Sequence, residues 1–199
     1  MKANRTFISV ISSLVLVFCF ASTSQAMTPE GKKEAQQNIE YLFKKVTERM
    51  AIKLPQDPEF LPFGAGMDMN GKVNFIFTDR KHQYTAEAAM LLVRQAQLSN
   101  ADAGRLLGVA TIYRYAYKDE KGNDKEQINV EMEYVNGYAM VRAIEVIEQD
   151  GKKMLGRSGD KEFEAKIFRQ ELVEKLKANN NQQPTTNNQQ PNNNQQPSK

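Results

Sequence analysis

The chain has 199 residues, and its 27 lysines and arginines exceed its 24 acidic residues by only enough for a formal charge of +3. So small an excess gives no electrostatic case for nucleic-acid binding. The single cysteine, Cys19, excludes an intrachain disulfide and a cysteine-based metal site. The single histidine, His82, gives little support to a zinc site or a Ser-His-Asp triad. We therefore expect no metal and no cofactor.

Residues 1–26 have the layout of a secretory signal peptide. Lys2 and Arg5 precede an apolar run over 7–20, and small residues follow it up to Ala26. The run is about 14 residues long, which is shorter than the ~20 residues of a membrane-spanning helix. We expect cleavage after Ala26, export to the periplasm or the medium, and no stable membrane insertion. The mature formal charge would be +1, because Lys2 and Arg5 leave with the signal.

An amphipathic helix is predicted from residue 28 to about residue 52. Thr28 is a good N-cap, Pro29 suits the first helical position, and Glu30 places an acid in the first turn. Apolar residues then recur at spacings of three and four, namely Ala35, Ile39, Leu42, Val46 and Met50. We expect this stripe to pack on a core and the following prolines to end the helix.

A first hairpin follows, with strands at 63–69 and 72–78. The Asn70-Gly71 pair between them suits a tight turn. Gly64 and Gly66 lack the third glycine and the following helix of a phosphate-binding loop. We expect them to mark a bulge or the close approach of another element.

Short motifs in this region resemble the pattern of a family of uncharacterised bacterial proteins. The motifs are Pro62-Phe63-Gly64, Asn70-Gly71-Lys72-Val73, and Glu133 followed by Gly137-Tyr138. Family members carry P-F-G, then D-G-K-V on a hairpin, then a helix, then strands ending in E-x-x-x-G-Y. The resemblance covers about 59–146, and Asn70 stands where the family usually has aspartate. It implies a fold of this kind and no particular activity.

A second helix and a long strand come next. Thr85 can cap a helix over 86–98, whose few charges indicate burial over much of its surface. The strand over 106–117 carries Tyr113, Tyr115 and Tyr117 on one face. Such a strip can stack bases or sugars, although tyrosine is also a good strand former without any ligand. A charged loop, 118–125, leads to the next strand.

The central feature of the sequence is the hairpin over 126–148. Ile128, Val130, Met132 and Tyr134 alternate with polar residues before Asn136-Gly137. A two-residue turn at Asn136-Gly137 predicts that Tyr134 faces Ala139 and Met132 faces Val141. The same register places Glu131 opposite Arg142 as a cross-strand ion pair.

With this register, the other face of the hairpin is half apolar and is a candidate interaction surface. Its candidate residues are Met140, Arg142, Ile144 and Val146, on the side of Glu131 and Glu133. The C-terminal helix, a second copy of the chain, or a foreign partner could cover this face.

The C-terminal part is predicted to contain a tight turn at Asp150-Gly151, a short strand near Met154, a helix over 161–177, and a disordered tail over 178–199. The tail repeats Asn-Asn-Gln-Gln-Pro and contains nothing apolar to bury. The expected fold is a single α+β domain over 27–177, with an antiparallel sheet of about five to six strands in the order α-ββ-α-βββ(β)-α.

Two functional hypotheses follow from these features. The first is a non-catalytic binding or protein-interaction module of the cell envelope, with an unknown protein partner or self-association and no nucleic acid. The alternative is a hydrolase that acts on envelope polysaccharide through Glu131 and Glu133, which a strand would space about 7 Å apart. We assign no catalytic, cofactor-binding or metal-binding residue from the sequence.

Overall fold

The computed structural model describes residues 27–79 and 81–181, so the predicted signal peptide and most of the predicted tail lie outside the described residues. Within these residues, six strands form one antiparallel sheet in the order β2-β1-β3-β4-β5-β6. The predicted α+β class and element order are confirmed. The elements are α1 (Pro29–Lys53), β1 (Phe63–Asp68), β2 (Val73–Ile76), α2 (Ala86–Asp102), β3 (Leu106–Lys118), β4 (Asp124–Tyr134), β5 (Ala139–Gln149), β6 (Lys152–Glu162) and α3 (Gln170–Asn181).

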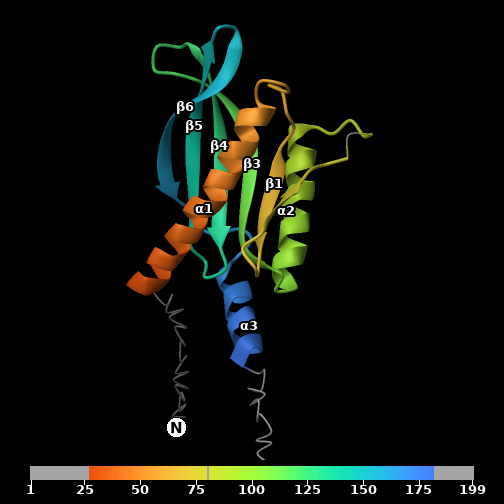
Figure 1. The fold of residues 1–199 in the computed structure, drawn as a ribbon, viewed down its shortest axis with the longest axis vertical. Helices are drawn as coiled ribbons and strands as arrows, with labels where there is room; N and C mark the ends of the chain where they lie inside the picture. Colours follow the sequence, from red (N-terminus) through yellow and green to blue (C-terminus); the bar gives the residue numbers. More distant parts are fainter. Residues whose placement is uncertain (1–26, 80, 182–199) are drawn as a thin grey trace, which may run out of the picture.

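Helix α1 crosses one face of the sheet, here called the first face, over β3 and β4 (Figure 1). Thr28 begins the helix, because its side chain accepts a hydrogen bond from the Gly31 N–H at 3.2 Å. The predicted apolar stripe of α1 is buried against strand residues such as Phe63, Ile128 and Met132. Each such side chain contributes about 1.5–3 kcal/mol when fully buried. This layer is the main core.

Helix α2 lies on the opposite face, here called the second face, against β1 and β3. The helix approaches Gly64 so closely that a Cβ there would lie 2.7 Å from Val93 Cγ1. This confirms the predicted close approach of another element. Gln97 is buried in the same contact, where it donates to the Ala110 carbonyl at 2.8 Å and accepts from the Thr111 hydroxyl at 2.9 Å.

The C-terminal elements differ from the sequence prediction. Residues 161–162 continue β6, which is a long strand, and α3 runs over Gln170–Asn181 instead of 161–177. Four residues of the predicted tail, 178–181, therefore belong to the helix. Between β6 and α3 lies the linking segment, residues 163–169. Its apolar side chains pack with α3 and the end of α2 in a second, smaller core that includes Ala101, Val109, Phe168 and Leu172.

The register of the central hairpin is shifted by one residue from the prediction. Met132 faces Met140 and Glu133 faces Ala139. The turn has three residues, because Tyr134 donates to the Tyr138 carbonyl at 2.9 Å and Gly137 donates back to the Tyr134 carbonyl at 2.9 Å. Gly137 has a φ of 90°, as expected for a three-residue loop that ends in a left-handed glycine. The predicted two-residue turn is wrong.

This shift exchanges the two faces of β5, so that side chains predicted on the second face lie on the first. Met140 and Ile144 lie on the first face, where they are only 6% and 3% exposed in the main core. Arg142 does not face Glu131; it binds Glu40 of α1 and Asp160 of β6. Val146 is half-buried beside the same core. The predicted half-apolar face shared with Glu131 does not exist, although a partner role for these four residues stays untested.

No helix within residues 27–79 and 81–181 is both long and apolar enough to cross a membrane.

Candidate functional site

The second face is covered unevenly, and the uncovered half forms a hollow that we call the open groove. Helix α2 covers β1 and β3, while the linking segment and α3 lie toward one end of the sheet (Figure 1). Between them is a hollow of about 1000 Å³. Its floor contains Val141, Ala143 and Gly159, and its walls include Tyr113, Glu131 and Lys166. This groove is the candidate site.

The floor is low because two rows of paired residues place small side chains at its centre. One row runs Asn129, Ala143, Gly159 across β4, β5 and β6, and the next runs Glu131, Val141, Lys161. A Cβ added to Gly159 would meet nothing within 4 Å, so this part of the floor is open space. The hollow therefore follows from the register of three strands.

Glu131 is the most strongly constrained polar group at the groove. Its carboxylate accepts from Arg94 Nη2 of α2 at 2.6 Å, from the Tyr113 hydroxyl of β3 at 2.9 Å, and from Lys166 Nζ at 2.9 and 3.0 Å. Only 11% of its side chain is exposed. Three elements besides β4 thus fix one carboxylate, and Glu131 joins α2 to the linking segment.

The charge state of Glu131 follows from these partners. Burial acts to raise its pKa, but the hydrogen bond from Lys166 and the charge of Arg94 outweigh burial and hold the pKa below its ordinary value. Glu131 is therefore ionised at neutral pH and is a poor proton donor. The predicted pair between Glu131 and Arg142 is replaced by pairs with Arg94 and Lys166.

The Glu131→Gln variant should lose about 1–3 kcal/mol of unfolding free energy at neutral pH, because two cations lose an ionic partner. A folded-state pKa below the ordinary 4.5 means that ionised Glu131 stabilises the fold above about pH 4.5. That stabilisation disappears as the pH falls through the folded-state pKa. Urea unfolding measures the free energy of unfolding of both proteins at about pH 7 and about pH 3. The difference between wild type and variant should be smaller at the lower pH. A gap of equal size at both pH values would contradict the network.

Glu133 has a different role from Glu131, although both lie on the second face. It is buried, and its Oε2 accepts from the backbone N–H groups of Ile167 at 2.7 Å and Phe168 at 3.0 Å. Burial raises its pKa, although these amide bonds act in the opposite direction. Glu133 is not among the residues that line the groove. It anchors the linking segment to the sheet.

Glu133 also provides a matched comparison for the pH measurement. Because its pKa is raised on folding, its ionisation disfavours the folded state as the pH rises through that pKa. The free-energy gap between wild type and Glu133→Gln should therefore change with pH in the opposite direction to the Glu131→Gln gap. If the free-energy differences of both variants changed with pH in the same direction, the pKa directions of Glu131 and Glu133 would be contradicted.

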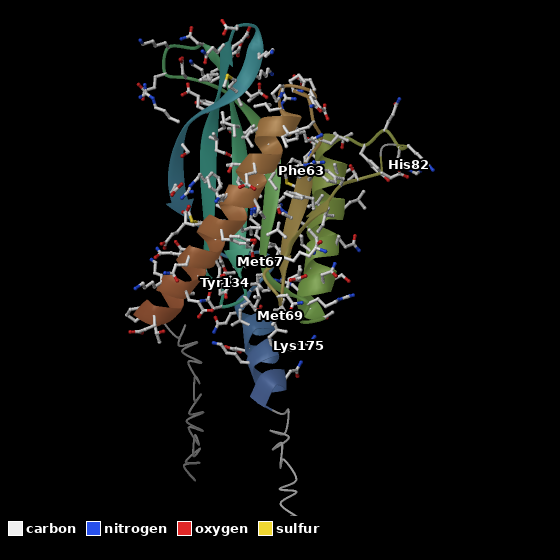
Figure 2. All side chains as sticks on the ribbon, in the orientation of Figure 1. Phe63, Met67, Met69, His82, Tyr134 and Lys175 are labelled. Carbon is white, nitrogen blue, oxygen red and sulfur yellow. The ribbon has the colours of Figure 1, made fainter. Side chains whose placement is uncertain are left out.

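The remaining sequence candidates lie away from the groove. His82 projects from the loop ahead of α2 (Figure 2) and is mostly exposed, with its Nδ1 3.5 Å from an Asp79 oxygen. Gly64 and Gly66 face packed side chains and leave no space for a phosphate. Within residues 27–79 and 81–181, no group of three or more His, Cys, Asp or Glu side chains is arranged to hold a metal ion.

The tyrosine strip, Tyr113, Tyr115 and Tyr117, extends from the wall of the groove along β3. Tyr113 is tied to Glu131, whereas Tyr115 and Tyr117 are 52% and 37% exposed. The last two rings lie within 17° of parallel, with centroids 6.2 Å apart. Gln127 of β4 lies opposite Tyr115, and Asn129 lies opposite Tyr113. The strip and the groove thus form one continuous surface.

Sequence reasoning identified the tyrosines, Glu131 and Glu133 but missed Arg94, Lys166 and the small floor residues. Lys166 is 35 positions from Glu131 and Arg94 is 37 positions away, so no local pattern signals their contact. The predicted register placed Val141 and Ala143 on the first face, whereas the structure pairs them with Glu131 and Asn129 on the second face.

No family model, curated protein or solved structure matches this chain. The resemblance to a family of uncharacterised bacterial proteins therefore stays a prediction.

Proposed function

We propose that the chain is an exported, non-catalytic binding module of the cell envelope and that the open groove is its ligand site. The observation that carries this proposal is the uncovered half of the second face, with its hollow of about 1000 Å³. Ligand pockets in proteins typically measure about 300–1,000 Å³ and combine an apolar floor with a few fixed polar groups. The open groove has both features, in Val141 and Ala143 on the floor and in Glu131 on the wall.

Preorganisation of the wall supports a binding role. The Glu131 carboxylate is held by Tyr113, Arg94 and Lys166, so its orientation is set before any ligand arrives. Groups that are already ordered lose little conformational entropy on binding, and more of the contact energy is retained as affinity.

The same geometry disfavours the alternative of a polysaccharide hydrolase. A glycosidase needs a protonated acid and a second carboxylate on either side of the scissile bond. Glu131 has a lowered pKa and two cationic partners, and Glu133 binds backbone amides outside the groove lining. A Glu133→Gln variant that abolished turnover of an envelope polysaccharide would favour the hydrolase.

Export rests on residues 1–26, which carry the charged, apolar and small-residue regions of a signal peptide. N-terminal sequencing of protein recovered from the envelope or the medium should find Met27 first. Met1 at the start of such material would contradict export with cleavage.

The binding site can be tested by filling the groove. Ala143→Trp places a large ring on the floor, and Gln149→Trp, at the exposed end of the same strand, is the matched control. Envelope extract is passed over immobilised wild type and both variants, and the retained material is analysed for protein and sugar. The proposal expects material that wild type and Gln149→Trp retain and that Ala143→Trp loses. Equal retention by all three proteins would show that the groove is not the site.

A further inference from the structure

The side chains along the open groove indicate the chemistry of its ligand. Three cations, Lys161, Lys166 and Arg169, and two acids, Glu131 and Glu164, line it, while the Asp160 carboxylate binds Arg142 on the first face. An excess of one cation gives only a weak field for a polyanion or a polycation. The groove offers hydrogen-bond donors and acceptors together, which a neutral ligand with many hydroxyl groups can use, because each hydroxyl both donates and accepts.

Amide side chains add to this pattern beside the tyrosine strip. Gln127 Nε2 donates to Asn129 Oδ1 at 2.8 Å, which holds the two amides in fixed orientations. One shared bond leaves the pair with further donors and acceptors, since each amide carries two N–H groups and a carbonyl oxygen. Hydroxyl groups of a ligand lying along β3 would meet this pair on one side.

The exposed tyrosines provide flat apolar surface next to these polar groups. Tyr115 and Tyr117 lie nearly parallel, with centroids 6.2 Å apart, and both are open to solvent. Ring faces of this kind attract the C–H faces of pyranose sugars by burial of apolar surface and by dispersion. A ligand that has both hydroxyl edges and flat C–H faces is a saccharide.

We propose that the open groove and the tyrosine strip bind a neutral saccharide chain, with sugar rings stacked on Tyr115 and Tyr117 and hydroxyl groups bonded by Gln127, Asn129 and the groove walls. This inference rests on the proposed binding function and specifies its ligand class. A single-stranded nucleic acid would also stack on tyrosines, but the small net charge of the groove gives little attraction to its phosphates.

The experiment measures binding of four neutral probes, cellotetraose, chitotetraose, maltotetraose and mannan, to the purified protein. The chain contains no tryptophan, so intrinsic tyrosine fluorescence can report contact with the strip, and calorimetry supplies the affinity. Heparin and a single-stranded oligo-dT serve as polyanionic competitors at low and physiological salt. We expect at least one neutral probe to bind, with little dependence on salt.

Two variants and a control then locate the site. The double variant Tyr115→Ala/Tyr117→Ala should weaken binding of that probe by roughly tenfold or more, because both stacking faces are lost. Tyr115→Phe should bind within about twofold of wild type, because the ring face remains. The control Tyr41→Ala removes an exposed tyrosine from α1 and should have no effect. Urea unfolding checks that all variants remain folded.

The outcomes separate this inference from the proposed function. If no neutral probe binds, or if the double variant binds like wild type, the saccharide assignment is wrong. If Ala143→Trp blocks retention of a peptide or if only the polyanions bind, the groove is a binding site for another ligand class and the saccharide assignment is again wrong. If neither the binding of neutral probes nor the retention of extract components requires the groove, both proposals fail.

Discussion

Replacing Ile144 by aspartate should lower the free energy of unfolding by about 4 kcal/mol or more, because the new carboxylate would be buried without a partner. Ile144 is 3% exposed and faces Ile128 across the β4–β5 ladder, beneath α1. A loss of this size is a large part of the 5–15 kcal/mol that stabilises a typical domain. Urea unfolding followed by circular dichroism measures it directly.

Ile147→Asp is the matched control for this substitution. Ile147 lies on the same strand and is 39% exposed, so its replacement should change the unfolding free energy by less than about 1 kcal/mol. The comparison also tests the register of the central hairpin. If Ile144→Asp were as stable as Ile147→Asp, Ile144 would not lie under α1 and the three-residue turn would be wrong.

Replacing Phe168 by alanine should lower the free energy of unfolding by about 3–5 kcal/mol, the usual cost of deleting a buried aromatic side chain. Phe168 is fully buried in the second core, and its backbone N–H is bound by Glu133. The loss combines the missing apolar contacts and the cavity that remains, since packed cores collapse only partly around a void.

Phe163→Ala controls for the loss of a phenylalanine in the same linking segment, because Phe163 is only half-buried. It should cost clearly less than Phe168→Ala. Hydrogen exchange adds a local measurement: the Ile167 and Phe168 amides should be protected in wild type and should exchange faster in Phe168→Ala. Unprotected amides in wild type would contradict the anchoring role of Glu133.

Several elements could be predicted from the sequence because the interactions that form them are local. The N-terminal helix needs only its Thr28 cap and its apolar stripe, both of which are visible within 25 residues. The two Asn-Gly pairs indicated the positions of two hairpin turns, because few other residue pairs adopt the positive φ angles of tight turns. The α+β class followed from strands that are joined by tight turns and grouped between helices, which is typical of an antiparallel sheet.

The register of the central hairpin was not determined locally. Asn136-Gly137 permits a two-residue turn and also a three-residue turn that ends in a left-handed glycine. In the structure, Asn136 donates to the Gly31 carbonyl at 2.8 Å and accepts from the Tyr138 N–H at 3.1 Å, which ties the turn to the start of α1. A contact across 105 positions thus accompanies the observed register, and one residue of shift moved Met140 and Ile144 from the second face to the first.

The conformation of the linking segment also depends on long-range contacts. Phe163 and Ile167 have helical spacing, and the sequence therefore indicated a helix from 161. Glu133, more than thirty positions earlier, instead accepts the backbone N–H groups of Ile167 and Phe168, and β6 continues through Glu162. These two bonds and the continuation of β6 take the place of the first nine residues of the predicted helix.

The sequence by itself determined the first two helices, the positions of the hairpin turns, the fold class and the tyrosine strip, because each depends on neighbours along the chain. Tertiary structure alone decided the open groove. Its small floor requires three strands in one register, and its Glu131 wall requires Arg94 and Lys166 to approach from elements more than thirty positions away. Side-chain periodicity specifies which face a residue can occupy, but long-range pairing selects the face that it does occupy.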